Sequence, residues 1–108
     1  MSESAEKILT EENVRKALTT VIDPELQIDI VSLGLIYDVK VEDATKAVIR
    51  MTLTTPGCPL APVIDQMVRE SLFGLVADID QDVIINLTFD PPWLPDMMSE
   101  EARLELGL

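Results

Sequence analysis

The chain contains no histidine and only one cysteine, Cys58. Without imidazole it cannot form a Ser-His or Cys-His nucleophilic pair or a histidine-ligated metal site, so most hydrolase mechanisms are excluded. A single cysteine cannot form an internal disulfide, which suits a reducing compartment. The apolar runs are short, and none approaches the roughly 20 residues that a membrane helix requires. These absences predict a soluble, cytoplasmic protein.

Basic residues are also few. The 8 lysines and arginines are outnumbered by 20 acidic residues, which gives a net charge of -12. Affinity for nucleic acid comes largely from Lys and Arg contacts with phosphate, and the chain has no Gly-x-x-Gly loop of the RNA-binding type. We therefore expect neither nucleic acid nor a membrane as a partner.

The length and composition fit a single domain, since 108 residues with 47% hydrophobic residues can form one core. Residues 1–12 are polar and acidic and lack the pattern of a secretory signal or a transit peptide. We expect residues 1–9 to form a flexible tail and residues 10–108 to form the domain.

Helical patterns occur at three places. Thr10 is typical of an N-cap, and the helix that it starts should end near Asp23, because Pro24 disfavours helical geometry there. A second apolar stripe at helical spacing runs from Leu60 to Val76. Ser99 can cap a last helix over residues 100–106, which Gly107 ends.

Strand patterns alternate with these helices, with apolar side chains at every second position. The first two form a predicted antiparallel hairpin, and the helix between the second and third makes a crossover. The sequence thus predicts an α/β two-layer fold of the α+β type, helix-strand-strand-helix-strand-helix, with helices on one face of a three-stranded mixed sheet. The expected core-facing strand residues are Leu35, Tyr37, Val39, Val41, Ala47, Ile49, Met51, Leu53, Val83, Ile85, Leu87 and Phe89.

Cys58 is the main candidate for chemistry, because it lies where a strand should end and a helix begin. The free N–H groups and positive dipole end of a helix favour the thiolate, which can ligate metal or attack. A buried structural cysteine is the alternative. The loop that would shape the site contains Thr55, Pro56, Gly57 and Pro59.

Two other features allow a functional and a structural interpretation. Asp23-Pro24-Glu25 sets two carboxylates around a rigid proline, which could hold a cation or could simply end a helix. Trp93, within a proline-rich segment, could form a partner surface or pack over one end of the core.

Five segments together resemble one known family. These are Asp23-Pro24-Glu25, residues 30–37 (IVSLGLIY), residues 52–59 (TLTTPGCP), Asp90-Pro91-Pro92-Trp93 and residues 98–102 (MSEEA). Their order resembles the SufT and PaaD type of metal-sulfur cluster assembly factor, from Thr10 to Gly107. The resemblance implies a compact α/β domain, a role in the maturation of iron-sulfur proteins, and importance for Asp23, Glu25 and Cys58.

The expected function is therefore that of an accessory factor, not an enzyme, in iron-sulfur cluster assembly or delivery. Its partners would be the assembly machinery and apo-proteins, and its cargo a transient iron-sulfur cluster. Clusters usually take four thiolates, so Cys58 must act in a homodimer, or in an adaptor that never holds the cluster stably. A thiol enzyme is disfavoured because a resolving cysteine is missing. An interaction module with a buried Cys58 stays open as the alternative.

Overall fold

The computed structural model describes residues 8–54 and 59–107. The expected order of helices and strands is confirmed, with one short 3-10 helix added before the last helix. The elements are α2 (Glu11–Leu18), β1 (Ile36–Glu42), β2 (Lys46–Met51), α3 (Ala61–Ser71), β3 (Val83–Leu87), η1 (Pro95–Met97) and α4 (Glu100–Glu105). Within these two ranges, no helix is both long and apolar enough to cross a membrane.

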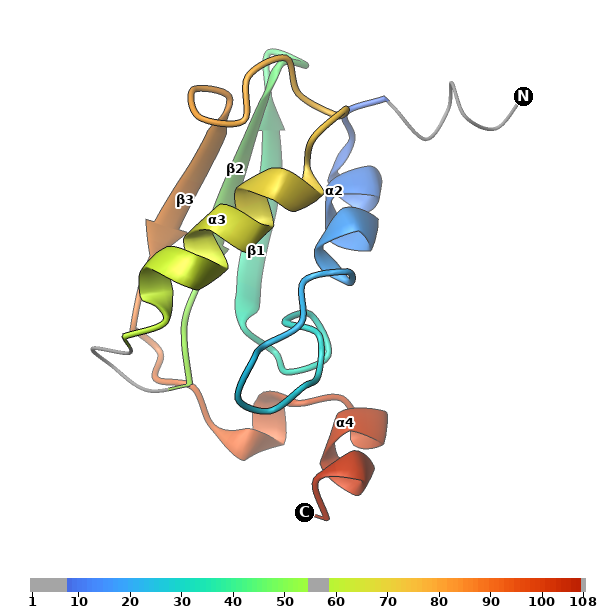
Figure 1. The fold of residues 1–108 in the computed structure, drawn as a ribbon, viewed down its shortest axis with the longest axis vertical. Helices are drawn as coiled ribbons and strands as arrows, with labels where there is room; N and C mark the ends of the chain where they lie inside the picture. Colours follow the sequence, from blue (N-terminus) through green and yellow to red (C-terminus); the bar gives the residue numbers. More distant parts are fainter. Residues whose placement is uncertain (1–7, 55–58, 108) are drawn as a thin grey trace.

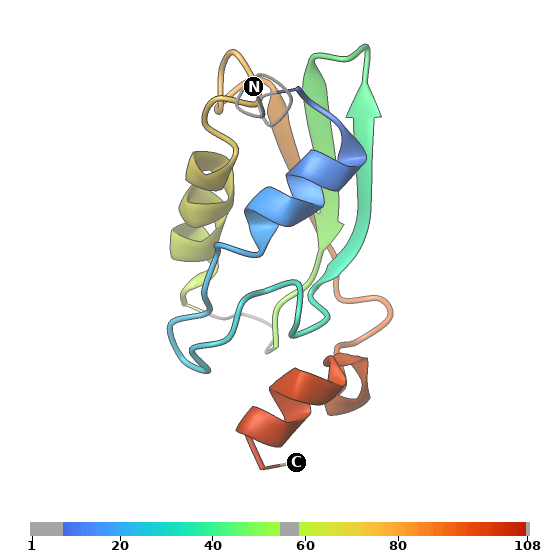
Figure 2. The same cartoon turned by 90° about the vertical axis from the view of Figure 1, so that its right-hand side faces the viewer.

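The sheet has the strand order β1-β2-β3 and is mixed, as expected. β1 and β2 form an antiparallel hairpin, and β2 and β3 run parallel with α3 as the connection between them. Helices α2 and α3 cover one face of the sheet (Figures 1 and 2). The short helix α4 lies beyond the end of the sheet, so the expectation that the helices share one face holds for α2 and α3 alone.

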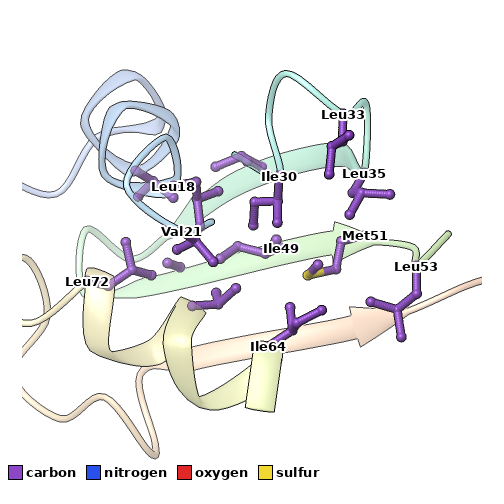
Figure 3. Packing of buried hydrophobic residues seen from close by; sticks show 14 of the residues in the cluster. Leu18, Val21, Ile30, Leu33, Leu35, Ile49, Met51, Leu53, Ile64 and Leu72 are labelled. Atoms are coloured by element: carbon purple, nitrogen blue, oxygen red, sulfur yellow. The ribbon is translucent and has the colours of Figure 1, made fainter. Parts of the chain in front are cut away.

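The core lies between this face and the two helices (Figure 3). The alternation in the second strand is confirmed, since Ala47, Ile49, Met51 and Leu53 are all buried. The burial of each large apolar side chain contributes about 1.5–3 kcal/mol. Loop residues also enter the core, notably Ile30 and Leu33. The core therefore extends past the strands toward one end of the molecule.

Helix α2 is shorter than the apolar spacing predicted. It starts at the expected N-cap, where Thr10 Oγ1 accepts the N–H of Asn13 at 3.0 Å, but it ends at Leu18. The hydroxyls of Thr19 and Thr20 bond to carbonyls three residues earlier. Such side-chain bonds compete with the helical ladder, so the helix ends several residues before Asp23.

Helix α3 also ends early, at Ser71 instead of near Val76. The following turn contains Gly74, whose φ of +96° is incompatible with a continued helix. Leu87, the last residue of β3, and Phe89, two positions beyond the strand, were expected to be in the core but are 47% and 37% exposed. Leu87 is exposed because it lines an open cavity between the end of β3 and the first turn of α3.

Tyr37 was expected in the core, and this prediction was wrong. The register of β1 against β2 shifts between Ile36 and Asp38, which places Tyr37 at a bulge. Its hydroxyl donates to the carbonyl of Pro91 at 2.7 Å, and the guanidinium of Arg50 lies 5.5 Å from the ring centroid. Because a bulge re-aims a side chain, alternation alone could not predict this position.

Candidate functional site

The described parts of the segments that the sequence singled out gather at one end of the molecule. We call this the site end: residues 19–35, 52–54, 59–60 and 88–107, around the carboxyl ends of β2 and β3 and the start of α3 (Figures 1 and 2). The opposite end, called the hairpin end, consists of the β1–β2 turn (residues 43–45) and residues 72–82. In mixed α/β structures, the carboxyl ends of parallel strands are the usual place for a site.

Asp23 shapes the first loop of the site end. It is only 3% exposed, and its Oδ1 atom accepts the N–H groups of Glu25 at 2.7 Å and Leu26 at 3.0 Å. The N–H of Asp23 donates to the carbonyl of Ile28 at 3.0 Å, which closes the loop. Glu25 is exposed. The two carboxylates therefore lie in one loop but differ in environment.

The next loop connects to the end of β2. Asp29 Oδ2 accepts the N–H of Ser32 at 2.9 Å, and the carbonyl of Leu35 accepts the N–H of Thr52 at 2.9 Å. Thr52 is fully buried, although alternation put it on the polar side of the strand. Pairing of β2 ends at Met51, and the chain then runs against the loop at Leu35. The hydrogen bond between Thr52 and Leu35 holds this loop against the chain just after the end of β2.

The C-terminal segment (residues 88–107) is bound to the same loop by long-range hydrogen bonds. The indole N–H of Trp93 donates to the carbonyl of Leu33 at 2.7 Å. The N–H of Ser99 donates to the carbonyl of Ser32 at 2.7 Å. Trp93 is half-buried and packs against the core, so the packing interpretation of its ring is confirmed. A partner surface at its rim remains a prediction.

Gly34 permits this contact. Its φ of +79° is the left-handed region, and a Cβ atom added there would lie 2.3 Å from the carbonyl oxygen of Met97. No side chain fits so close to a backbone oxygen. The loop and the C-terminal segment therefore meet at a position that requires glycine.

The start of α3 lies at the same end. The N-cap residue Leu60 makes no side-chain cap hydrogen bond, Pro62 occupies the first turn, and that turn has no acidic residue. The predicted reactive residue, Cys58, lies outside the described residues together with Thr55, Pro56 and Gly57. In the sequence it stands three positions before Ala61, the first residue of α3. Pro59 is described and is exposed.

A cavity of about 370 Å³ opens beside the start of α3. It is lined by Met51, Leu53, Ala61, Pro62, Ile64, Asp65, Ile85 and Leu87. Asp65, the only charged residue of the lining, accepts from Arg69 Nε at 2.8 Å. Sequence reasoning missed Asp65 and the cavity; the apolar residues of the third strand were the available signal. In the described part of the chain, no group of three potential metal-ligating side chains occurs.

Comparisons with known proteins agree with the resemblance that the motifs indicated. The family model described as "Iron-sulfur cluster assembly protein" matches residues 11–84. The chain is 45% identical over 97 residues to the Fe-S protein maturation auxiliary factor YitW of Bacillus subtilis, covering 90% of this chain and 93% of that protein. It is 47% identical over 89 residues to the Fe-S protein maturation auxiliary factor SufT of Staphylococcus aureus, covering 82% and 98%.

A solved structure supports the fold. The crystal structure of a DUF59 domain of unknown function from Bacillus anthracis has a TM-score of 0.82 with this chain at 40% identity, and the match covers 91% of this chain and 92% of that one. The motifs, the match over residues 11–84 and the two relatives lead to the same assignment. The chain belongs to the iron-sulfur cluster assembly protein family.

Proposed function

We propose that this protein is a non-enzymatic accessory factor that assists the assembly of iron-sulfur clusters or their delivery to apo-proteins. One observation carries the proposal most strongly: the described parts of the segments that carry the family resemblance converge on the site end, although they lie far apart in the sequence. The relatives named as maturation auxiliary factors support the same role. A cytoplasmic location and contact with the assembly machinery belong to this proposal.

Cys58 is the proposed reactive centre. It precedes α3, an 11-residue helix whose first turn has no acidic residue to offset the positive end of the helix dipole. A thiolate near such an end is stabilised, and the thiolate is the form that binds iron or attacks sulfur. The neighbouring Pro59 is exposed, which favours access from solvent.

The two carboxylates have different roles in this proposal. Asp23 already accepts two backbone N–H groups through Oδ1, so we assign it the positioning of its loop. Glu25 is exposed and is the better candidate for an oxygen ligand to iron. Thr55, Pro56, Gly57 and Pro59 would shape the loop that carries the thiol, with glycine giving the tight bend.

The cluster is cargo in this proposal, and one chain supplies only one thiolate. Four thiolates usually hold a cluster, so two routes remain. In the first, a homodimer contributes two Cys58 thiolates, completed by carboxylates or external thiols. In the second, the protein is an adaptor that brings an assembly component to an apo-protein without holding the cluster stably.

The central test is the activity of a cluster-dependent dehydratase in the native host under iron limitation, with the gene replaced by a Cys58→Ser version. We expect activity to fall while the protein level stays normal, and to return with the wild type. Phe73→Ser is the matched control, since Phe73 is 82% exposed at the hairpin end and should leave activity unchanged. Normal activity in the Cys58→Ser strain would contradict a reactive thiol and favour the interaction module with a structural cysteine.

Anaerobic reconstitution separates the two routes. Purified protein is incubated with ferric iron, a thiol reductant and sulfide, and bound iron and sulfide are measured per chain together with the mass in solution. The homodimer route predicts cluster only in a dimer, and its loss in Cys58→Ser. The adaptor route predicts zero iron and sulfide per chain, while the dehydratase assay still depends on Cys58.

A further inference from the structure

Among the described residues, strand β3 has part of its edge unpaired. It is the outer strand of the sheet, and no other described element lies on its outer side (Figure 1). The backbone groups of β2 bond to the even-numbered residues on and beside β3. Examples are the bond from the N–H of Ala47 to the carbonyl of Asp82 and the bond from the N–H of Thr88 to the carbonyl of Met51. Alternate residues of a strand direct their backbone groups to the same side. The backbone groups of Val83, Ile85 and Leu87 therefore face outward.

Arg69 closes only the beginning of this edge. Its guanidinium donates to the outward carbonyl of Val83 at 2.7 Å and also to the carbonyl of Ile79 at 2.9 Å. In the part of the chain that the structure describes, no partner bonds the outward groups of Ile85 and Leu87. The free edge is therefore two residues long and lies at the carboxyl end of β3.

The two edge strands of the sheet differ in protection. β1 carries charges at Asp38, Lys40 and Glu42, which discourage pairing with another strand. β3 has the sequence VIINL and no charged residue. An apolar, uncharged edge is the kind to which an extended peptide adds as a further strand.

The cavity lies directly beside this free edge. Ile85 and Leu87 line it from the strand, and Ala61, Pro62 and Ile64 line it from α3. A segment paired with Ile85 and Leu87 would direct alternate side chains between β3 and α3. The volume of about 370 Å³ is at the small end of ligand pockets and suits one or two apolar side chains.

Charge indicates what kind of segment fits. Asp65 is the only charged residue of the lining, and Arg69, the only basic residue of α3 and β3, is already bound to Asp65 and to backbone carbonyls. Asp82 and Asp90 flank β3 on either side. A second copy would bring the same acidic groups and a net charge of -12, so self-pairing is disfavoured.

We propose that an extended segment of a partner protein, apolar at alternate positions and followed by basic residues, adds to the edge of β3 and fills the cavity beside α3. Main-chain hydrogen bonds to Ile85 and Leu87 would provide affinity, and the cavity and the acidic residues Asp82 and Asp90 beside β3 would provide selectivity. The identity of this partner as an apo-protein or assembly component rests on the proposed function. The groove, which consists of the free edge of β3 and the cavity beside α3, rests on the geometry alone.

The test uses three labelled nine-residue peptides and fluorescence anisotropy. The first alternates valine with threonine and ends in two lysines, the second ends in two glutamates, and the third repeats the first with N-methyl groups on the amides that would face β3. We expect binding of the first, at least tenfold weaker binding of the second, and no binding of the third. Equal affinity for the first and third peptides, or no binding of the first, would overturn the proposal.

Variants on β3 localise the binding. Leu87→Pro removes an outward N–H while keeping the bond from Thr88 to Met51, and should weaken binding at least tenfold. Leu87→Glu, which adds a charge at the cavity, is the second variant should the first not fold. Ile84→Lys is the matched control on the other face of β3, and should change binding less than twofold. Equal binding by wild type and Leu87→Glu would contradict the assignment.

Hydrogen exchange of the wild type gives a readout that needs no variant. The amides of Ile85 and Leu87 should exchange fast in the free protein and slowly with the first peptide. Slow exchange that rises with protein concentration, with a dimer in sedimentation, would assign the edge to a second copy and overturn the proposal. If the peptide binds but Cys58→Ser leaves dehydratase activity unchanged, the groove stands and the proposed reactive role of Cys58 fails; the converse result retains that role and rejects the groove.

Discussion

The two ends of the sheet are constructed in different ways. At the hairpin end the turns are closed by local bonds: the Asp78 carboxylate accepts the N–H of Asp80 at 2.9 Å, and the β1–β2 turn is closed within four residues. At the site end, Tyr37 and Trp93 make bonds that span 54 and 60 positions. A substitution in a local turn affects that turn alone, whereas the site end is made from distant segments and depends on each contact between them. Substitutions should therefore have unequal effects at the two ends.

The largest expected difference is between two glycines with positive φ. Gly34→Ala at the site end combines backbone strain with a Cβ atom 2.3 Å from Met97 O, and should lower the free energy of unfolding by about 3 kcal/mol. Gly74→Ala at the hairpin end meets nothing within 4 Å and should cost about 1 kcal/mol, from backbone strain alone. Urea unfolding of both variants measures the difference. Equal midpoints would mean that the close contact at Gly34 does not constrain the fold.

Asp23→Ala is expected to have the next largest effect. It leaves the N–H groups of Glu25 and Leu26 without the acceptor that the buried carboxylate of Asp23 provides, which should cost about 2 kcal/mol. Asp23→Asn keeps the oxygen acceptor and should cost less than about 1 kcal/mol. Thermal and urea unfolding measure both. A similar loss for the two variants would indicate that the charge of Asp23, and not its acceptor, supports the loop.

Trp93→Phe tests a single hydrogen bond of the site end. It removes the indole donor to the carbonyl of Leu33 and part of the ring, and should lower the free energy of unfolding by about 1–2 kcal/mol. Phe73→Leu is the control at the hairpin end, where an 82% exposed side chain should matter by less than about 0.5 kcal/mol. Chemical unfolding followed by circular dichroism is suitable for both. A larger loss for Phe73→Leu would reverse the comparison of the ends.

The smallest effect should have the opposite sign. Ala44 adopts a φ of +58° in the β1–β2 turn, a conformation in which glycine avoids the Cβ contact. Ala44→Gly should raise the free energy of unfolding by up to about 0.5–1 kcal/mol, after the greater freedom of glycine in the unfolded chain is included. The shift of the unfolding midpoint measures this. A destabilised variant would show that the entropy of glycine outweighs the relief of strain.

The sequence predicts the fold well where the signal is local. The alternation of Ala47, Ile49 and Met51 requires only neighbouring residues, and these side chains are buried as expected. The errors occur where another interaction overrides the pattern. The hydroxyls of Thr19 and Thr20 end α2, and the bulge at Tyr37 re-aims its ring.

The arrangement of the site end is less accessible from the sequence. The motifs indicate which residues matter, but the bonds that join them end on the backbone carbonyls of Leu33, Ser32 and Pro91. Every residue has a carbonyl, so such acceptors have no sequence signature. Only Gly34 could have indicated the close approach. Cys58 lies outside the described residues, so its role stays a prediction.

The bond between Trp93 and Leu33 also has a consequence for the timing of folding during synthesis. The ribosome makes the loop around Leu33 early, and the indole that binds it sixty residues later. Non-local contacts form only after the intervening chain is available. A chain that stops before Trp93 would contain all the residues of the hairpin end but could not form the long-range contacts of the site end. We therefore expect incomplete copies to be unable to compete with the full-length protein for its partners.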